Sequence, residues 1–153
     1  MRFSESAMYA MRAMATIANQ ADGQPLRSSD IAGPAQIPDP YLSKVLRRLV
    51  VGGLLESRRG RNGGFLLARP ADDITFAQIL KAMDALPESG VCAFGYGVCN
   101  PEQPCSLHPI WMRYVAYTEA WAYATTLDDL GPAGEIPGWG AGGQLPHPVS
   151  SDA

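Results

Sequence analysis

Apolar side chains recur every three or four positions between residues 7 and 19, which is the spacing that places them on one face of an α-helix. A short helix is expected to follow, beginning at Ser28 or Ser29, because either hydroxyl can accept a hydrogen bond from the backbone at a helix start. Gly33-Pro34 is expected to interrupt it after one or two turns, since proline does not sustain helical hydrogen bonding. The pattern therefore predicts a long helix and then a short one.

A third helix is expected from Pro40 to about Val51, with Asp39 as its N-cap residue and Pro40 at the first helical position. Its apolar residues recur at i, i+3, i+4 and i+7 and are Leu42, Val45, Leu46 and Leu49. The polar and basic residues on its other faces are Ser43, Lys44, Arg47 and Arg48. Gly52-Gly53 is expected to end the helix, because glycine readily adopts the left-handed conformation of a C-terminal cap.

Two short strands are predicted at residues 55–59 and 65–68, joined as a hairpin by the glycine-rich segment 60–64. Thr75 and Gln78 have the spacing of a capping box, in which each side chain bonds the backbone N–H of the other residue. This box is expected to open a helix that carries Ile79, Leu80 and Met83.

The segment 87–104 is rich in glycine and proline and is expected to be a loop. Pro109 begins a last helix that is expected to reach about Leu130, with apolar residues nearly all the way round. A helix without a broad polar face is buried on more than one side. We expect a second copy of the chain to bury the remaining apolar surface of this helix, which predicts a homodimer. Residues 131–153 hold many glycines and prolines and are expected to form a disordered tail.

The distribution of charged residues along the chain indicates a function. The 153 residues are 46% hydrophobic and 18% charged, with a net charge of -3. One acidic residue, Glu56, lies in the stretch 44–69, whose basic residues are Lys44, Arg47, Arg48, Arg58, Arg59, Arg61 and Arg69. A basic block inside an acidic chain is the form expected of a DNA-binding face. With neither a signal peptide nor a membrane-length apolar run in view, we expect a cytoplasmic protein whose thiols stay reduced.

A helix, a turn, a basic helix and a basic hairpin, in this order, are typical of a winged helix-turn-helix. The predicted fold class is mainly α with a small β-hairpin wing, followed by a long C-terminal dimerisation helix. The expected parts are a winged helix-turn-helix DNA-binding domain at 1–88, a cysteine-rich loop at 89–106, a dimerisation helix at 107–130 and a disordered tail at 131–153.

The basic helix has the width that the major groove of DNA admits, and arginines beside glycines suit a minor groove. The residues expected to contact double-stranded operator DNA are Ser29, Tyr41, Ser43, Lys44, Arg47, Arg48, Arg59, Gly60 and Arg61. The alternative is an ordinary solvated basic surface. The ordered set of cap, basic helix, glycine pair and basic hairpin favours DNA binding.

The loop holds the three cysteines of the chain, in the spacing Cys92-x6-Cys99-x5-Cys105-x2-His108. Thiolates select iron–sulfur clusters, zinc and copper(I). A Cys₃His zinc site has the right ligand count but lacks the usual close cysteine pairs. An iron–sulfur cluster suits the wide gaps, although the ferredoxin spacings are absent. Three free or redox-active cysteines are the third alternative.

Several segments resemble the IscR/NsrR (Rrf-two) family of regulators over about residues 1–130. The segments that carry the resemblance are Met1-Arg2-Phe3-Ser4, the run from Tyr41 to Leu49, Gly52-Gly53-Leu54-Leu55, the wing from Ser57 to Ala68, and Ile74-Thr75. The resemblance implies a dimeric winged-helix repressor or activator. It assigns DNA recognition to the helix from Pro40 and minor-groove contact to Arg59 and Gly60.

Family members with three cysteines in this loop bind an iron–sulfur cluster. The resemblance therefore implies that Cys92, Cys99 and Cys105 are ligands of a two-iron or four-iron cluster. Some relatives add a histidine shortly after the third cysteine, the position of His108. The nitric-oxide sensors use an acidic residue in the first helix of the partner, where this chain has Met8; Glu5 lies one turn earlier.

These observations predict a transcriptional regulator whose DNA affinity is set by an iron–sulfur cluster that senses iron, redox state or nitric oxide. One alternative is a zinc- or thiol-dependent winged-helix DNA-binding protein without a cluster. Another is a redox or metal-handling protein whose basic face binds a protein. A Ser-His-Asp set, a carboxylate pair and a phosphate loop are not evident, so an enzyme is not expected.

Overall fold

The computed structural model describes residues 3–20 and 23–130. Its elements are α1 (Glu5–Ala18), α2 (Ser28–Ala35), α3 (Asp39–Val51), β1 (Leu55–Arg58), β2 (Gly64–Leu67), the 3-10 helix η1 (Ala71–Asp73), α4 (Phe76–Ala82), α5 (His108–Ala124) and the 3-10 helix η2 (Asp128–Leu130). The predicted tail at 131–153 lies outside the described residues. In the part of the chain that the structure describes, the helices all fall short of the length and apolarity needed to span a membrane.

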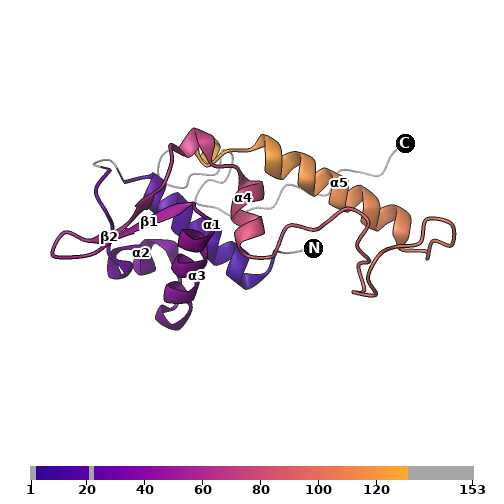
Figure 1. The fold of residues 1–153 in the computed structure, drawn as a ribbon, viewed down its shortest axis with the longest axis horizontal. Coiled ribbons are helices and arrows are strands. Elements are labelled where there is room, and N and C mark those ends of the chain that lie inside the picture. The colour runs from indigo at the N-terminus through magenta and orange to yellow at the C-terminus, as the bar shows by residue number, and fades with distance from the viewer. Residues whose placement is uncertain (1–2, 21–22, 131–153) are drawn as a thin grey trace, which may run out of the picture.

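The four helices α1 to α4 and the hairpin β1–β2 gather at one end of the molecule, and α5 extends away from them (Figure 1). Helix α1 packs against α2, α3, α4 and β2. The largest fully buried side chains of this shared core are Met14, Ile31, Leu46, Leu49, Leu54, Ile74, Ile79 and Leu80. This arrangement is the winged helix-turn-helix that the sequence predicts.

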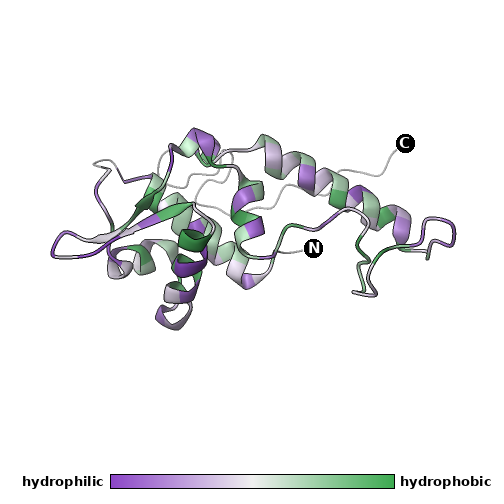
Figure 2. Ribbon diagram, viewed as in Figure 1, coloured by the Kyte–Doolittle hydropathy of each residue, from purple (hydrophilic) through white to green (hydrophobic). Residues whose placement is uncertain are grey.

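The apolar stripe of α3 is buried as its spacing predicts, with Leu42, Val45, Leu46 and Leu49 all in the core. Gly53 supplies the left-handed residue after the helix, with φ +70°. Strands β1 and β2 pair antiparallel, with Leu55 opposite Leu67 and Arg58 opposite Gly64. Figure 2 shows that hydrophilic residues gather at the tip of this hairpin and along part of α3.

The capping box before α4 is confirmed, since Thr75 Oγ1 accepts a hydrogen bond from Gln78 N and Thr75 N donates to Gln78 Oε1. Two other predicted helix caps are wrong. The N-cap residue of α2 is Arg27, not Ser28 or Ser29, and its side chain makes no cap hydrogen bond. The N-cap residue of α3 is Pro38, and Asp39 is already the first helical residue.

Helix α2 continues through Pro34 rather than ending there, and it closes at Gln36 in the left-handed conformation. Ile31 and Ala35, one turn apart, are both buried, so packing of the helix face outweighs the hydrogen bond that proline removes.

Helix α5 ends at Ala124, earlier than the predicted Leu130. The chain becomes extended at Thr125 and pairs with the segment that precedes α4. Phe76 N donates to Thr125 O at 3.0 Å, and Leu127 N donates to Ile74 O at 2.8 Å. The burial of Leu127 in the core accompanies this pairing, which ties the end of α5 to the winged-helix core.

Candidate DNA interface and cysteine loop

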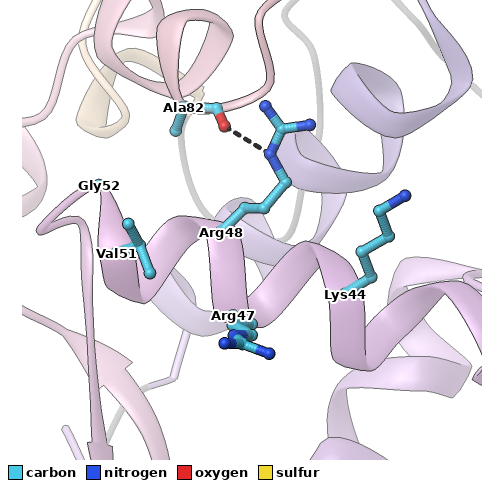
Figure 3. Close-up of a pocket in the computed structure, with 6 residues that line it drawn as sticks. All are labelled: Lys44, Arg47, Arg48, Val51, Gly52 and Ala82. Carbon is cyan, nitrogen blue, oxygen red and sulfur yellow. Dashed lines mark hydrogen bonds between the residues drawn. The ribbon is translucent and has the colours of Figure 1, made fainter.

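The solvent-facing side of α3 is polar and basic. Ser43, Lys44 and Arg47 are exposed, and half of Tyr41 is exposed. Figure 3 shows Arg47 pointing away from Ala82, at the far side of α3 from α4. These side chains are therefore accessible along one helix face, as contact with a DNA groove requires.

Arg48 is only partly exposed, because its guanidinium is hydrogen-bonded to residues at the end of α4 and just beyond it. Arg48 Nε donates to Ala82 O at 2.9 Å (Figure 3), and Nη2 donates to the Asp84 carboxylate. An open groove beside the second half of α3 is lined by Lys44, Arg47, Arg48, Val51, Gly52 and Ala82. Of the basic residues predicted on α3, Arg48 is thus the one that joins this helix to the end of α4.

The hairpin tip carries two exposed arginines. Arg59, Gly60 and Arg61 are exposed, and Gly60 has φ +103°. Gly63 N donates to Gly60 O at 3.0 Å, which closes the tip. A Cβ at Gly63 would lie 2.3 Å from the Arg58 carbonyl oxygen, so the tight turn requires glycine there.

Ser29 is exposed in the first turn of α2, where its hydroxyl donates a hydrogen bond to the Asp30 carboxylate. Arg27, immediately before α2, is a residue that the sequence reasoning missed. Its Nη2 donates to the carbonyl oxygen of Arg61, 34 positions along the chain, at 2.9 Å. A contact between residues so far apart leaves no local signal in the sequence.

The first part of the cysteine loop is a small hairpin. Cys92 N donates to Gly97 O at 2.8 Å, and Cys99 N donates to Gly90 O at 2.7 Å. Side chains of α5 hold this hairpin and its base. Trp111 Nε1 donates to Val91 O at 2.7 Å, and Ser89 Oγ donates to Glu119 Oε2 at 2.8 Å.

The hairpin brings Cys92 and Cys99 together. Backbone N–H groups of Phe94 and Tyr96 donate to the Cys92 sulfur and lower the pKa of this thiol, and a hydrogen bond with Cys99 acts in the same direction. Partial burial raises the pKa of Cys99, as does the neighbouring Cys92. A second thiolate beside the first is disfavoured by charge repulsion unless a cation joins them. Ionisation of both thiols would therefore be favoured by a bound cation.

The other predicted ligands lie at the start of α5. Cys105 is exposed and near enough to Cys99 for its charge to raise the pKa of that thiol. His108 is the first residue of α5, and its backbone N donates to Cys105 O at 3.1 Å. Glu5, on α1, accepts a hydrogen bond from the Tyr9 hydroxyl at 3.0 Å.

Within residues 3–20 and 23–130, no three His, Cys, Asp or Glu side chains are grouped closely enough to hold a metal ion. The donor types fit an iron–sulfur cluster, and the backbone N–H groups at Cys92 suit a sulfur ligand of such a cluster. Cys105 and His108 are not assembled with the Cys92–Cys99 pair, so binding would require the loop to close.

Helix α5 keeps large apolar side chains exposed. Tyr117 is 77% exposed and Ile110, seven residues earlier on the same face, is 61% exposed, whereas Val115 is fully buried within the chain. The exposed face is the one available to a second subunit.

Comparison with known proteins agrees with this architecture. Residues 3–132 match the Rrf2 family model, described as an iron-dependent transcriptional regulator. A candidate HTH-type transcriptional regulator of Mycobacterium tuberculosis, Rv1287, is 34% identical over 98% of this chain and 87% of its own length. The HTH-type transcriptional regulator IscR of Escherichia coli is 32% identical over 72% of this chain and 68% of its own length.

Solved structures are similar over most of the chain. CymR (YrzC), the global cysteine regulator of B. subtilis, has a TM-score of 0.68 and 25% identity, covering 85% of this chain and 95% of its own. IscR of T. potens has a TM-score of 0.66 and 23% identity, covering 85% of each chain, and supports the fold alone.

Proposed function

This chain belongs to the Rrf2 family of transcriptional regulators, and on that premise we propose that it is a dimeric regulator whose affinity for operator DNA depends on an iron–sulfur cluster held by Cys92, Cys99 and Cys105. The observation that carries the proposal is the loop itself. It contains all three cysteines, pairs two of them in a hairpin, and lies between the DNA-binding domain and α5. A bound cluster would supply sensitivity to oxidants, iron supply or nitric oxide.

The DNA contacts are assigned to α3 and the wing. Lys44 and Arg47, both exposed on α3, are assigned to base edges or phosphates in the major groove, and the exposed Arg59 and Arg61 are assigned to the minor groove. Ser29, Tyr41, Ser43 and Gly60 complete the proposed contact surface. Arg48, which is engaged by Ala82 and Asp84, is assigned the role of positioning α3.

Arg48 also offers a physical connection between the cysteine loop and the DNA-binding helix. Asp84 follows α4 with φ +51°, at the point where the chain leaves for the loop. A change in the path of the loop displaces Asp84, and its bond to Arg48 carries that displacement to α3. Coupling of this kind between two sites is reciprocal and typically changes affinity by about 5–150-fold.

Asp84→Gly should reduce the difference in operator affinity between cluster-loaded and cluster-free protein. Glycine keeps the left-handed backbone and removes the carboxylate. Asp84→Asn is the matched control, because asparagine tolerates the same backbone and retains an acceptor oxygen. Operator titrations of both forms of each variant measure the effect. An undiminished difference in Asp84→Gly would show that this contact does not transmit the state of the loop.

The proposed dimer uses the exposed face of α5. Tyr117→Asp should convert a two-chain particle into a single chain, because it buries an unpaired charge in the interface. Light scattering after size-exclusion chromatography gives the mass. Val51→Asp, a similar change at an exposed apolar residue of α3, is the control and should remain dimeric. A wild type with the mass of one chain, or a dimeric Tyr117→Asp, would contradict the assignment.

Anaerobic purification followed by iron, sulfide and zinc analysis tests the cofactor. Matching amounts of iron and sulfide are expected. Stoichiometric zinc without sulfide would favour the zinc alternative.

A thiol-dependent regulator without a cluster is the second candidate. It is favoured by the hydrogen-bonded Cys92–Cys99 pair and by the absence, among the described residues, of an assembled three-ligand group. Protein that contains neither metal nor sulfide, and whose DNA affinity changes on thiol oxidation, would support this candidate.

A further inference from the structure

The base of the wing is attached to the backbone just before α2. Leu26 N donates to Phe65 O at 2.9 Å, and Phe65 N donates to Leu26 O at 2.7 Å, so Leu26 pairs with β2 like a short third strand. A Cβ at Gly64 would lie 2.4 Å from the Leu26 carbonyl oxygen. Glycine at that position is what allows the two backbones to meet.

The tip of the wing, residues 59–63, lies beyond this attachment and is rich in glycine. Its internal backbone hydrogen bond joins Gly63 N to Gly60 O. Among the described residues, Arg27 is the one whose side chain hydrogen-bonds the tip, through Nη2 to the Arg61 carbonyl oxygen. Two attachments in consecutive residues, Leu26 at the base and Arg27 at the tip, thus fix the direction of the hairpin relative to α2 and α3.

We propose that Arg27 is a positioning residue for DNA binding, which holds the wing tip so that Arg59 and Arg61 meet the minor groove together with α3 in the major groove. The inference rests on the proposed wing contact with DNA. A charge-assisted hydrogen bond is stronger than one between neutral groups. Without it, the glycine-rich tip samples more orientations in the free protein. Binding must then restrict those orientations at a cost in free energy.

Arg27 contacts the backbone carbonyl of Arg61 and not its side chain. The side chains of the wing can therefore be removed without removing the acceptor for Arg27. Arg61→Ala keeps the carbonyl oxygen and therefore keeps the acceptor for Arg27. A double-mutant cycle between Arg27 and the wing side chains can consequently distinguish positioning from direct contact.

The experiment uses the full chain and a duplex selected by the wild type from random DNA. Four proteins are titrated: the wild type, Arg27→Ala, the wing variant Arg59→Ala with Arg61→Ala, and the triple variant. Arg27→Ala is expected to weaken binding by about tenfold in the wild-type background, the equivalent of one charge-assisted hydrogen bond. In the wing variant the same change should alter affinity less than twofold.

Two further readouts separate positioning from general effects. Amide exchange at Gly63 should be faster in Arg27→Ala, while the urea midpoint of the whole domain stays close to that of the wild type. Arg12→Ala, which removes an exposed arginine from α1, controls for the loss of one positive charge and should change neither the amide exchange at Gly63 nor the affinity for the duplex.

Equal losses from Arg27→Ala in both backgrounds would mean that Arg27 contacts a phosphate itself, and the inference would be wrong. Wild-type affinity in Arg27→Ala would also overturn it. If the wing variant bound as tightly as the wild type, the proposed wing contact would fail and the role of Arg27 would fail with it. Weak binding by the wing variant without coupling to Arg27 would overturn the positioning role alone.

Discussion

Alanine in place of Cys99 should leave the anaerobically purified protein with little or no iron and sulfide. Cys99 lies between the other two cysteines in sequence and is hydrogen-bonded to Cys92 in the hairpin. Its loss leaves at most three ligands and removes one of the two thiols that are already paired. Cys92→Ala and Cys105→Ala are expected to have the same effect, because thiolates are the principal iron ligands in such sites.

His108→Ala should be milder than any cysteine change, since water, a small thiol or Glu5 of the partner subunit can take one open position. It should alter redox potential and reactivity more than iron content, because ligand identity tunes a cluster. Ser106→Ala is a matched control in the same segment and should retain full iron and sulfide. Equal iron and sulfide in the wild type, the three cysteine variants and the histidine variant would place the ligands elsewhere.

Arg47→Ala and Arg59→Ala should each weaken operator binding strongly, and their combination should reduce it toward non-specific binding. Loss of a base contact costs about 1–3 kcal/mol and relaxes the preference at one position. Loss of a phosphate contact lowers the salt slope by about 0.9 and acts on all sequences alike. Titrations at several salt concentrations, with operator and scrambled duplexes, separate the two kinds of contact.

Arg12→Ala provides the control for this second prediction, because Arg12 is an exposed arginine on α1, outside both α3 and the wing tip. It should leave both operator affinity and salt slope near those of the wild type. If Arg47→Ala and Arg59→Ala bound operator DNA as the wild type does, the assignment of α3 and the wing to the DNA interface would be wrong.

The elements that sequence reasoning located correctly are those with strong local signals. The spacing of Leu42, Val45, Leu46 and Leu49 determines which face of α3 is buried, whatever the helix packs against. The capping box at Thr75 and Gln78 and the glycine-rich turn between β1 and β2 are likewise local. These features were sufficient to predict the winged helix-turn-helix.

The elements that it located wrongly depend on contacts between distant residues. Helix α5 stops at Ala124 because Thr125 and Leu127 pair with the backbone around α4, a pairing that the apolar pattern of α5 does not contain. The carbonyl contacts of Arg48 and Arg27 are of the same kind. Each is made to a backbone atom, so the identity of the distant residue carries no signal of the contact.

The candidate cofactor site falls between these cases. The sequence shows three thiols in one loop, but their grouping depends on a hairpin in which Gly95 and Gly97 have positive φ. That hairpin pairs Cys92 with Cys99 and leaves Cys105 and His108 at the start of α5. The number of possible ligands was therefore predictable, whereas their arrangement was not.

We propose that the state of the cysteine loop sets DNA affinity, and this dependence can be measured on one protein. It is tested most directly by titrating one selected operator duplex with a single anaerobic preparation, before and after a chelator removes the iron and desalting removes the released sulfide. Both forms are first shown to be dimeric, so that a change of assembly is not mistaken for coupling. The two affinities should differ by about tenfold or more, within the usual range of coupling between sites. If the protein binds the operator with the same affinity in both forms, the state of the cysteine loop does not set DNA affinity.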